Sequence, residues 1–173
     1  MKKGILLLLI TVTLKTFAGT DSLKTVSSVD VQKYAGKWFE IASMPNRFQK
    51  NCDCSTAEYA VRPDGKIDVV NSCNNNKKMK RDTVTGVASP VNSSNSHLKV
   101  KFKVFSGDYQ IIALAPDYSY AMVATGDRKY LWILSRKKLL EEETIKKLVK
   151  QAQDQGFNTE KLNFTKQSCY NNY

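Results

Sequence analysis

The chain has 173 residues, 42% of them hydrophobic, with only 4 Pro and 8 Gly, a composition that excludes a disordered or fibrous chain and predicts one compact domain. The 27 Lys and Arg residues outnumber the 16 Asp and Glu residues and give a net charge of +11, which by itself indicates nucleic acid, an anionic membrane or an acidic ligand as partner. One histidine and four cysteines disfavour a mononuclear zinc enzyme and a histidine-dependent catalytic triad.

Residues 1–18 combine a basic start, an apolar run and small residues at the end. This pattern predicts a secretory signal peptide that is cut after Ala18. The alternative is an N-terminal membrane anchor, but Lys15 interrupts the apolar run before the roughly 20 residues that cross a bilayer. We therefore divide the chain into a signal peptide (1–18), an N-terminal extension (19–28) and one domain (29–173).

Removal of the signal peptide takes away Lys2, Lys3 and Lys15 and leaves 24 basic against 16 acidic residues, a net charge of +8. Export places the mature chain in the periplasm or outside the cell, in an oxidising compartment. There, an even number of cysteines predicts disulfides. No cysteine precedes Cys52, so we expect no lipid anchor at the N-terminus.

Short segments with the residue pattern of β-strands follow the extension. The clearest is residues 97–104, where polar and apolar residues alternate as in a strand buried on one face. The turn at Pro63-Asp64-Gly65 predicts a hairpin. The regular spacing of the segments favours a sandwich or a barrel. The predicted strands are residues 38–42, 56–61, 66–70, 83–88, 97–104, 109–115, 118–125 and 130–135.

The segment after the last of these strands has a different period. Apolar residues recur at i, i+3, i+4 and i+7 from Ile145 to Ala152. This spacing predicts an amphipathic helix that begins near Glu141, ends at Gly156 and lies on the sheet. A short final strand is expected at residues 161–165.

Three sequence motifs resemble those of the lipocalin family. A Gly-x-Trp sequence resembles the first motif. An Asp-Tyr pair resembles the second, although Pro116 precedes it where many members have threonine. Residues 130–136 resemble the third, and the chain is most similar to the bacterial lipocalin and apolipoprotein D branch, over roughly residues 28–170. The motif residues are Gly36, Trp38, Asp117, Tyr118 and Arg136.

The resemblance implies an all-β fold: an eight-stranded antiparallel up-and-down β-barrel with one C-terminal α-helix packed outside. It also implies that Trp38 and Arg136 stack as a cation–π pair at the closed end of the barrel, where Gly36 lets the chain approach closely. The implied activity is binding or transport of a lipophilic molecule, such as a fatty acid or lysophospholipid, without turnover, cofactor or metal.

Strand alternation extends this orientation to a cavity lining, if Trp38 and Arg136 point inward. The resulting interior is apolar and aromatic and suits a long apolar ligand with one polar head. The same alternation places Ala42 inside. The alternative is a barrel filled by its own side chains. The predicted lining residues are Glu40, Ala57, Tyr59, Val69, Asn71, Val100, Phe102, Tyr120, Met122, Trp132 and Leu134.

The geometry of the predicted hairpin brings Cys73 opposite either Cys54 or Cys52 and does not decide between them. The resemblance to apolipoprotein D implies that Cys54 pairs with Cys169. That leaves Cys52 to pair with Cys73.

Two other functions compete with ligand binding. A protein acting at anionic membranes or polyanions would use the basic strand face of Lys99, Lys101 and Lys103 and the basic tract at residues 77–81. We expect an anionic membrane surface, and no nucleic acid, as the partner of such a face. An enzyme is disfavoured, because His97 has no acidic neighbour in sequence and the chain contains no nucleophile motif such as G-x-S-x-G.

Overall fold

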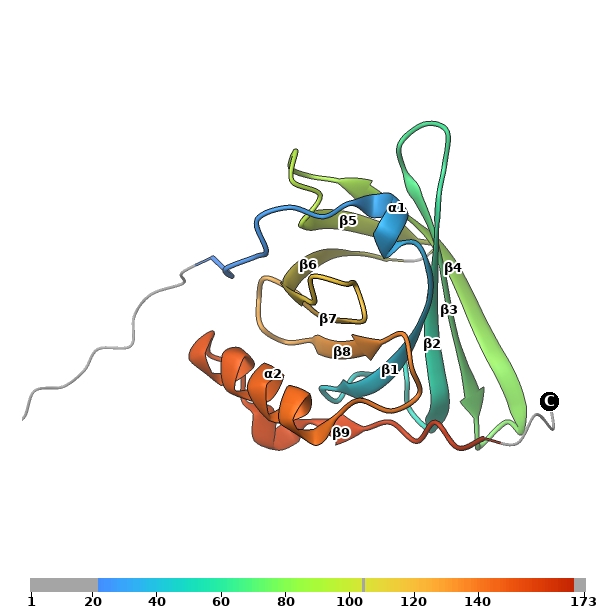
Figure 1. Cartoon of the computed structure of the whole chain (residues 1–173). Coiled ribbons are helices and arrows are strands. Elements are labelled where there is room, and N and C mark those ends of the chain that lie inside the picture. The colour runs from blue at the N-terminus through green and yellow to red at the C-terminus, as the bar shows by residue number, and fades with distance from the viewer. Residues whose placement is uncertain (1–21, 104, 170–173) are drawn as a thin grey trace, which may run out of the picture.

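The computed structural model describes residues 22–103 and 105–169, so the predicted signal peptide, residues 1–18, lies outside the described residues. Strands make up most of the described part (Figure 1). The helical elements are α1 (Val31–Tyr34), α2 (Glu142–Asp154) and the 3-10 turn η1 (Thr159–Lys161). The strands are β1 (Gly36–Ser43), β2 (Cys52–Val61), β3 (Ile67–Asn75), β4 (Lys80–Pro90), β5 (His97–Phe102), β6 (Ser106–Leu114), β7 (Tyr120–Ala124), β8 (Leu131–Ser135) and β9 (Asn163–Phe164).

Strands β1 to β8 follow one another around a barrel, and each is antiparallel to its neighbours. The barrel closes because β1 pairs with β8 as well as with β2. The short β9 pairs with the last part of β1, where Ala42 lies opposite Phe164. The predicted eight-stranded antiparallel barrel is confirmed, with one further short strand added to it.

The β2–β3 hairpin has the predicted turn and register. The backbone N–H of Lys66 donates to the Asp64 carboxylate at 3.1 Å, and Gly65 adopts a φ of +79° that side chains with a Cβ rarely tolerate. Tyr59 consequently lies opposite Val69, so the two side chains share one face of the sheet.

The up-and-down order divides the connections between two ends of the barrel. The first residues of β1 and the β2–β3, β4–β5 and β6–β7 connections lie at one end, which we call the closed end. The β1–β2, β3–β4, β5–β6 and β7–β8 connections lie at the other, which we call the open end. Loops far apart in sequence therefore lie together at each end of the barrel.

Buried apolar residues form two layers. One layer fills the closed half of the barrel interior around Trp38. The other lies between the outer surface of the barrel and α2, whose Leu148 and Ala152 are buried as the helix pattern predicts (Figure 1). Leu23, from the predicted N-terminal extension, belongs to this outer layer. No helix in the described part of the chain is long and apolar enough to cross a membrane.

Two disulfides fix the chain near the start of β2. Cys52 is bonded to Cys73, with 5.4 Å between their Cα atoms, and this bond links β2 to the end of β3. Cys54 is bonded to Cys169, with 6.2 Å between their Cα atoms, and this bond attaches the C-terminal segment to the barrel. This is the pairing that the resemblance implies.

Candidate ligand-binding site

The closed end of the barrel is sealed by Trp38 and Arg136. The Trp38 side chain is fully buried, and the Arg136 guanidinium carbon lies 3.8 Å from the centroid of the indole ring. The guanidinium also donates hydrogen bonds of 2.8–3.1 Å to four carbonyl oxygens within residues 33–37. A Cβ on Gly36, which has a φ of +90°, would lie 3.4 Å from an Arg136 nitrogen. The predicted cation–π pair is therefore present, beside a glycine in a left-handed conformation.

The Asp-Tyr motif forms the turn between β6 and β7 at this end. The Asp117 carboxylate accepts hydrogen bonds from the Ser119 hydroxyl at 2.7 Å and from the Ser119 backbone N–H at 3.1 Å. These hydrogen bonds hold the pKa of Asp117 below its usual value. The Tyr118 hydroxyl accepts from the backbone N–H of Asp30 at 2.9 Å. The motif thus fixes a turn and ties it to the segment before α1.

A cavity of about 460 Å³ occupies the open half of the barrel. The side-chain-filled barrel that we considered as an alternative is therefore wrong. Apolar and aromatic side chains from the barrel strands form most of its wall. The predicted positions that line the cavity are Glu40, Ala57, Tyr59, Val69, Asn71, Val100, Phe102, Trp132 and Leu134.

The prediction that Tyr120 and Met122 line the cavity is wrong. Both side chains lie in the outer layer with α2. Val123 pairs with Trp132 and lines the cavity instead. The predicted alternation was counted from Tyr118. That residue lies in the turn before β7 and has a φ of 59°, so the direction of its side chain does not indicate which residues of β7 face inward.

Ala42 was predicted to face the interior of the barrel, and it faces outward instead. The β1–β8 register shifts between Glu40 and Ala42, and Ala42 lies in the outer layer. A bulge adds one residue to a strand and reverses the facing of the residues after it. Alternation counted from Trp38 therefore holds as far as Ile41, which lies in the outer layer, and fails at Ala42.

Several lining residues were not predicted, because most of them lie in loops or near strand ends, where alternation has no meaning. Phe48 of the β1–β2 loop stacks on Phe105 with ring centroids 4.7 Å apart, and Phe105 contacts Phe102 at 4.8 Å. An aromatic group thus borders the entrance. Tyr130 lines the cavity on the inward face that alternation from Arg136 predicts. Lining residues that the sequence analysis missed include Arg47, Phe48, Gln49, Phe105, Tyr109 and Val123.

The buried carboxyl group of Glu40 connects the cavity wall to the β1–β2 loop and to the C-terminal segment. It accepts hydrogen bonds from the Ser43 hydroxyl at 3.0 Å, the Thr165 hydroxyl at 2.6 Å and the Gln49 amide. Burial raises its pKa. The Gln49 amide oxygen accepts from the Trp132 indole N–H at 2.9 Å, so the loop is bonded to a cavity side chain.

Three tyrosine hydroxyls meet at the inner end of the cavity, and we call this group the tyrosine trio. The Tyr109 hydroxyl lies 2.7 Å from that of Tyr34 and 2.9 Å from that of Tyr59. Burial raises the pKa of Tyr34 and Tyr109 well above the usual tyrosine value. It raises the pKa of Tyr59 to about 12. All three hydroxyls are therefore neutral in the physiological range.

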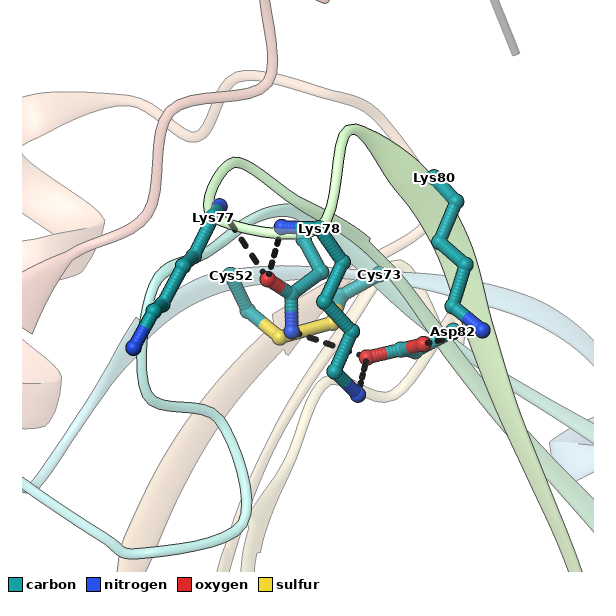
Figure 2. Close-up of polar contacts among 7 residues, drawn as sticks. Cys52, Cys73, Lys77, Lys78, Lys80 and Asp82 are labelled. Atoms are coloured by element: carbon teal, nitrogen blue, oxygen red, sulfur yellow. Dashed lines mark hydrogen bonds and ion pairs between the residues drawn. A yellow bond between two sulfur atoms is a disulfide. The ribbon is translucent and has the colours of Figure 1, made fainter.

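Positively charged side chains gather at the open end, and we call them the basic rim. The β3–β4 turn that carries two of them is fixed by Asn75, whose side-chain oxygen accepts from the backbone N–H groups of Lys77 and Lys78 at 3.2 and 3.1 Å. The Lys78 ammonium pairs with Asp82 at 2.8 Å, whereas the Lys77 side chain extends away from that carboxylate (Figure 2). The basic rim consists of Arg47, Lys50, Lys77, Lys78, Lys80, Arg81, Lys101, Lys103, Arg128 and Lys129.

The single histidine has an acidic partner that its sequence neighbours do not reveal. His97 Nε2 lies 3.3 Å from a carboxylate oxygen of Asp108, which β6 brings beside β5. The Lys99 ammonium lies 3.3 Å from the same oxygen. Asp108 thus joins the histidine to the outward-facing lysine row of β5.

Comparison with known proteins agrees with this architecture. The family model described as a lipocalin-like domain matches residues 29–167. The chain belongs to the lipocalin family. This lipocalin is 41% identical over 157 residues to temperature-induced lipocalin-1 of Arabidopsis thaliana, an alignment that covers 84% of this chain and 83% of the relative.

Other relatives confirm the branch that the motifs predicted. This lipocalin is 36% identical over 169 residues to the outer membrane lipoprotein Blc of Vibrio cholerae, which covers 95% of this chain and 99% of the relative. It is 32% identical over 151 residues to apolipoprotein D of Bos taurus, and this alignment covers 80% of this chain and 77% of the relative.

Solved structures confirm the fold. Lobster apocrustacyanin A1 superimposes with a TM-score of 0.66 at 19% identity, covering 80% of this chain and 79% of that one. Insecticyanin from the tobacco hornworm Manduca sexta superimposes with a TM-score of 0.65 at 23% identity, covering 84% of each chain.

Proposed function

We propose that this lipocalin binds and carries a small lipophilic ligand of the fatty acid or lysophospholipid class. The observation that carries the proposal is the cavity of about 460 Å³, which is largely apolar and lies in the half of the barrel that carries the basic rim. Such a site matches a ligand with a long apolar chain and a charged head. Members of the lipocalin family are generally binding or transport proteins, and we propose neither a catalytic step nor a cofactor.

Neighbouring residues of β5 allow a direct test with hexadecanoic acid and isothermal titration calorimetry. Val100 lines the cavity, whereas Lys99 is exposed on the outer face. Val100→Phe fills part of the cavity and should weaken binding about tenfold or more, because overpacking costs on the order of 1–3 kcal/mol. Lys99→Phe should bind as the wild type does. Absence of saturable binding by the wild type, or equal affinities for all three proteins, would contradict the proposal.

We further propose that the open end approaches an anionic membrane, where the ligand is collected or delivered. The specific support is that exposed apolar side chains accompany the basic rim, with Phe48 44% exposed and Met79 64% exposed. Positive charge together with exposed apolar groups suits a lipid surface better than a nucleic acid. We therefore propose no nucleic-acid partner.

We propose that the protein is exported, to the periplasm or outside the cell. Two disulfides support an oxidising compartment. N-terminal sequencing of the protein from its natural source should find Gly19 as the first residue, because export removes the signal peptide. A protein that retains residues 1–18 would contradict this proposal.

A further inference from the structure

We propose that the tyrosine trio, Tyr34, Tyr59 and Tyr109, is a buried binding site for an uncharged oxygen atom at the inner end of the ligand. The oxygen would belong to a hydroxyl or carbonyl group carried by the apolar chain. This inference rests on the proposed function, since it specifies which end group of a bound lipid the cavity favours.

The trio lies where the innermost part of a ligand would lie. Tyr59 and Tyr109 line the cavity. Tyr34 is 2% exposed, and its ring centroid lies 4.9 Å from that of Trp38, the residue that seals the closed end. A chain that enters from the open end therefore meets these hydroxyls last.

The hydroxyls of the trio have hydrogen-bonding capacity left over. Three hydroxyls carry three donor hydrogens, and the two contacts among them use two. Within residues 22–103 and 105–169 these hydroxyls make no other hydrogen bond to protein. One donor hydrogen and several acceptor lone pairs consequently remain for a ligand.

The surrounding wall offers little else to a polar group at this depth. The rings of Tyr59 and Tyr109 belong to the inner apolar layer, together with Val69, Val100 and Leu134. A buried donor hydrogen that no acceptor receives is costly, and so is a buried ligand oxygen without a hydrogen bond. A hydrogen bond between the two satisfies both groups.

The charges around the trio favour an uncharged oxygen over an ionised carboxylate. The trio is neutral, and the guanidinium of Arg136 stands behind Trp38, where it is already bonded to four backbone carbonyls. Among the described residues that line the cavity, Arg47 of the β1–β2 loop is the one basic residue, so an ionised carboxylate beside the trio would form no direct ion pair, and burial of an unpaired charge is strongly unfavourable. A charged head group therefore stays at the basic rim, and the trio takes an uncharged oxygen.

The test compares two fatty acids that differ only at the far end, hexadecanoic acid and 16-hydroxyhexadecanoic acid. Their dissociation constants are measured by calorimetry for the wild type, for the double variant Tyr59→Phe/Tyr109→Phe and for Tyr120→Phe. The double variant removes the two hydroxyls of the trio that line the cavity and keeps the rings. Tyr120→Phe removes a tyrosine hydroxyl outside the cavity, in the outer layer with α2. Comparing affinity ratios cancels the cost of dehydrating the ligand hydroxyl.

The affinity for the hydroxylated acid divided by that for hexadecanoic acid should be about three- to tenfold larger in the wild type and in Tyr120→Phe than in the double variant, as one hydrogen bond provides. Equal ratios in all three proteins would overturn the inference while leaving the proposed function intact. Failure of the wild type to bind either acid would overturn both.

A second measurement needs no variant. The ketone carbonyl of 15-oxohexadecanoic acid, labelled with carbon-13, should absorb at a lower infrared frequency when bound to the wild type than in an alkane solvent. An alkane-like frequency in the complex would count against a hydrogen bond to the trio.

Discussion

Trp38 and Arg136 hold the closed end through two kinds of interaction at once. The guanidinium lies over the indole ring, and the same group donates to carbonyl oxygens within residues 33–37. Backbone carbonyls that lose their donors in a buried place are destabilising. The pair therefore contributes to stability, at a distance from the ligand entrance.

Substitution of either residue should consequently destabilise the barrel. We expect Trp38→Ala to lower the free energy of unfolding by about 3–5 kcal/mol and Arg136→Ala by about 2–4 kcal/mol, as measured by urea unfolding. Arg62, at the same end, is exposed and forms ion pairs with Asp64 and Asp68 at the surface. Arg62→Ala should change the free energy by less than about 1 kcal/mol. Unchanged stability of Arg136→Ala would contradict the structural role.

Glu40 makes stability depend on pH, because burial raises its pKa in the folded protein. Above the unfolded-state pKa of about 4.3, the folded protein binds the proton more tightly than the unfolded chain. The contribution of Glu40 to stability therefore decreases as pH rises from that value through the raised folded pKa. Glu40→Gln should remove this decrease in urea unfolding measured from pH 4 to pH 7.

The control for this pH dependence is Glu58→Gln. Glu58 is an exposed residue of β2 whose carboxylate lies 3.6 Å from the Lys37 ammonium. This variant should keep the pH dependence of the wild type. If Glu40→Gln and the wild type had parallel stability profiles, the buried carboxyl group would not be the cause.

Among the elements, the C-terminal segment is fixed to the barrel by several independent contacts. Besides the Cys54–Cys169 disulfide, the Gln167 side-chain amide donates to the carbonyl oxygens of Glu40 and Ser55 at 2.8 and 2.9 Å. The segment thus acts as a part of the barrel wall.

The two disulfides should contribute unequally to stability. Cys54 and Cys169 are 115 residues apart in sequence, whereas Cys52 and Cys73 are 21 apart. Since a longer closed loop restricts the unfolded chain more, replacing the Cys54–Cys169 pair by serines should cost about 1.5 kcal/mol more than replacing the Cys52–Cys73 pair. Urea unfolding of the two double variants measures the difference. A larger loss for the Cys52–Cys73 pair would contradict this order.

Within individual strands and loops, the sequence predicted some features of the structure and missed others. The strand pattern and three motifs were sufficient for the barrel and the helix, and alternation identified nine residues that line the cavity. It failed for Met122 because Tyr118 adopts a positive φ, and for Ala42 because β1 contains a bulge. It said nothing of Phe48, since a loop has no period. Local backbone irregularities, which strand periodicity does not encode, account for these misses.

At the scale of the whole molecule, the positive charge is distributed unevenly. The basic rim surrounds the open end, where Asp53, Asp82, Asp108 and Asp127 offset only part of it. The lysines of the β3–β4 turn project there beside the Cys52–Cys73 disulfide (Figure 2). An anionic membrane would therefore orient the molecule with its entrance toward the lipid.

Lys77→Glu/Lys78→Glu should weaken binding to vesicles of phosphatidylcholine and phosphatidylglycerol by at least about tenfold at low salt, because each basic residue near the surface contributes about 1 kcal/mol. Vesicle cosedimentation measures this binding. The matched control is Lys137→Glu/Lys138→Glu, which reverses two adjacent lysines after β8 at the closed end. Equal weakening by both variants would show that total charge, and not orientation, governs membrane binding.

The positions of the two tryptophans give the protein two separate optical reporters. Trp38 is fully buried against a guanidinium at the closed end, whereas Trp132 lines the cavity and donates to Gln49. Ligand entry should alter the emission of Trp132 and leave that of Trp38 nearly constant, while unfolding alters both. In a Trp132→Phe variant the remaining signal reports unfolding alone, so occupancy and folding can be followed independently by fluorescence.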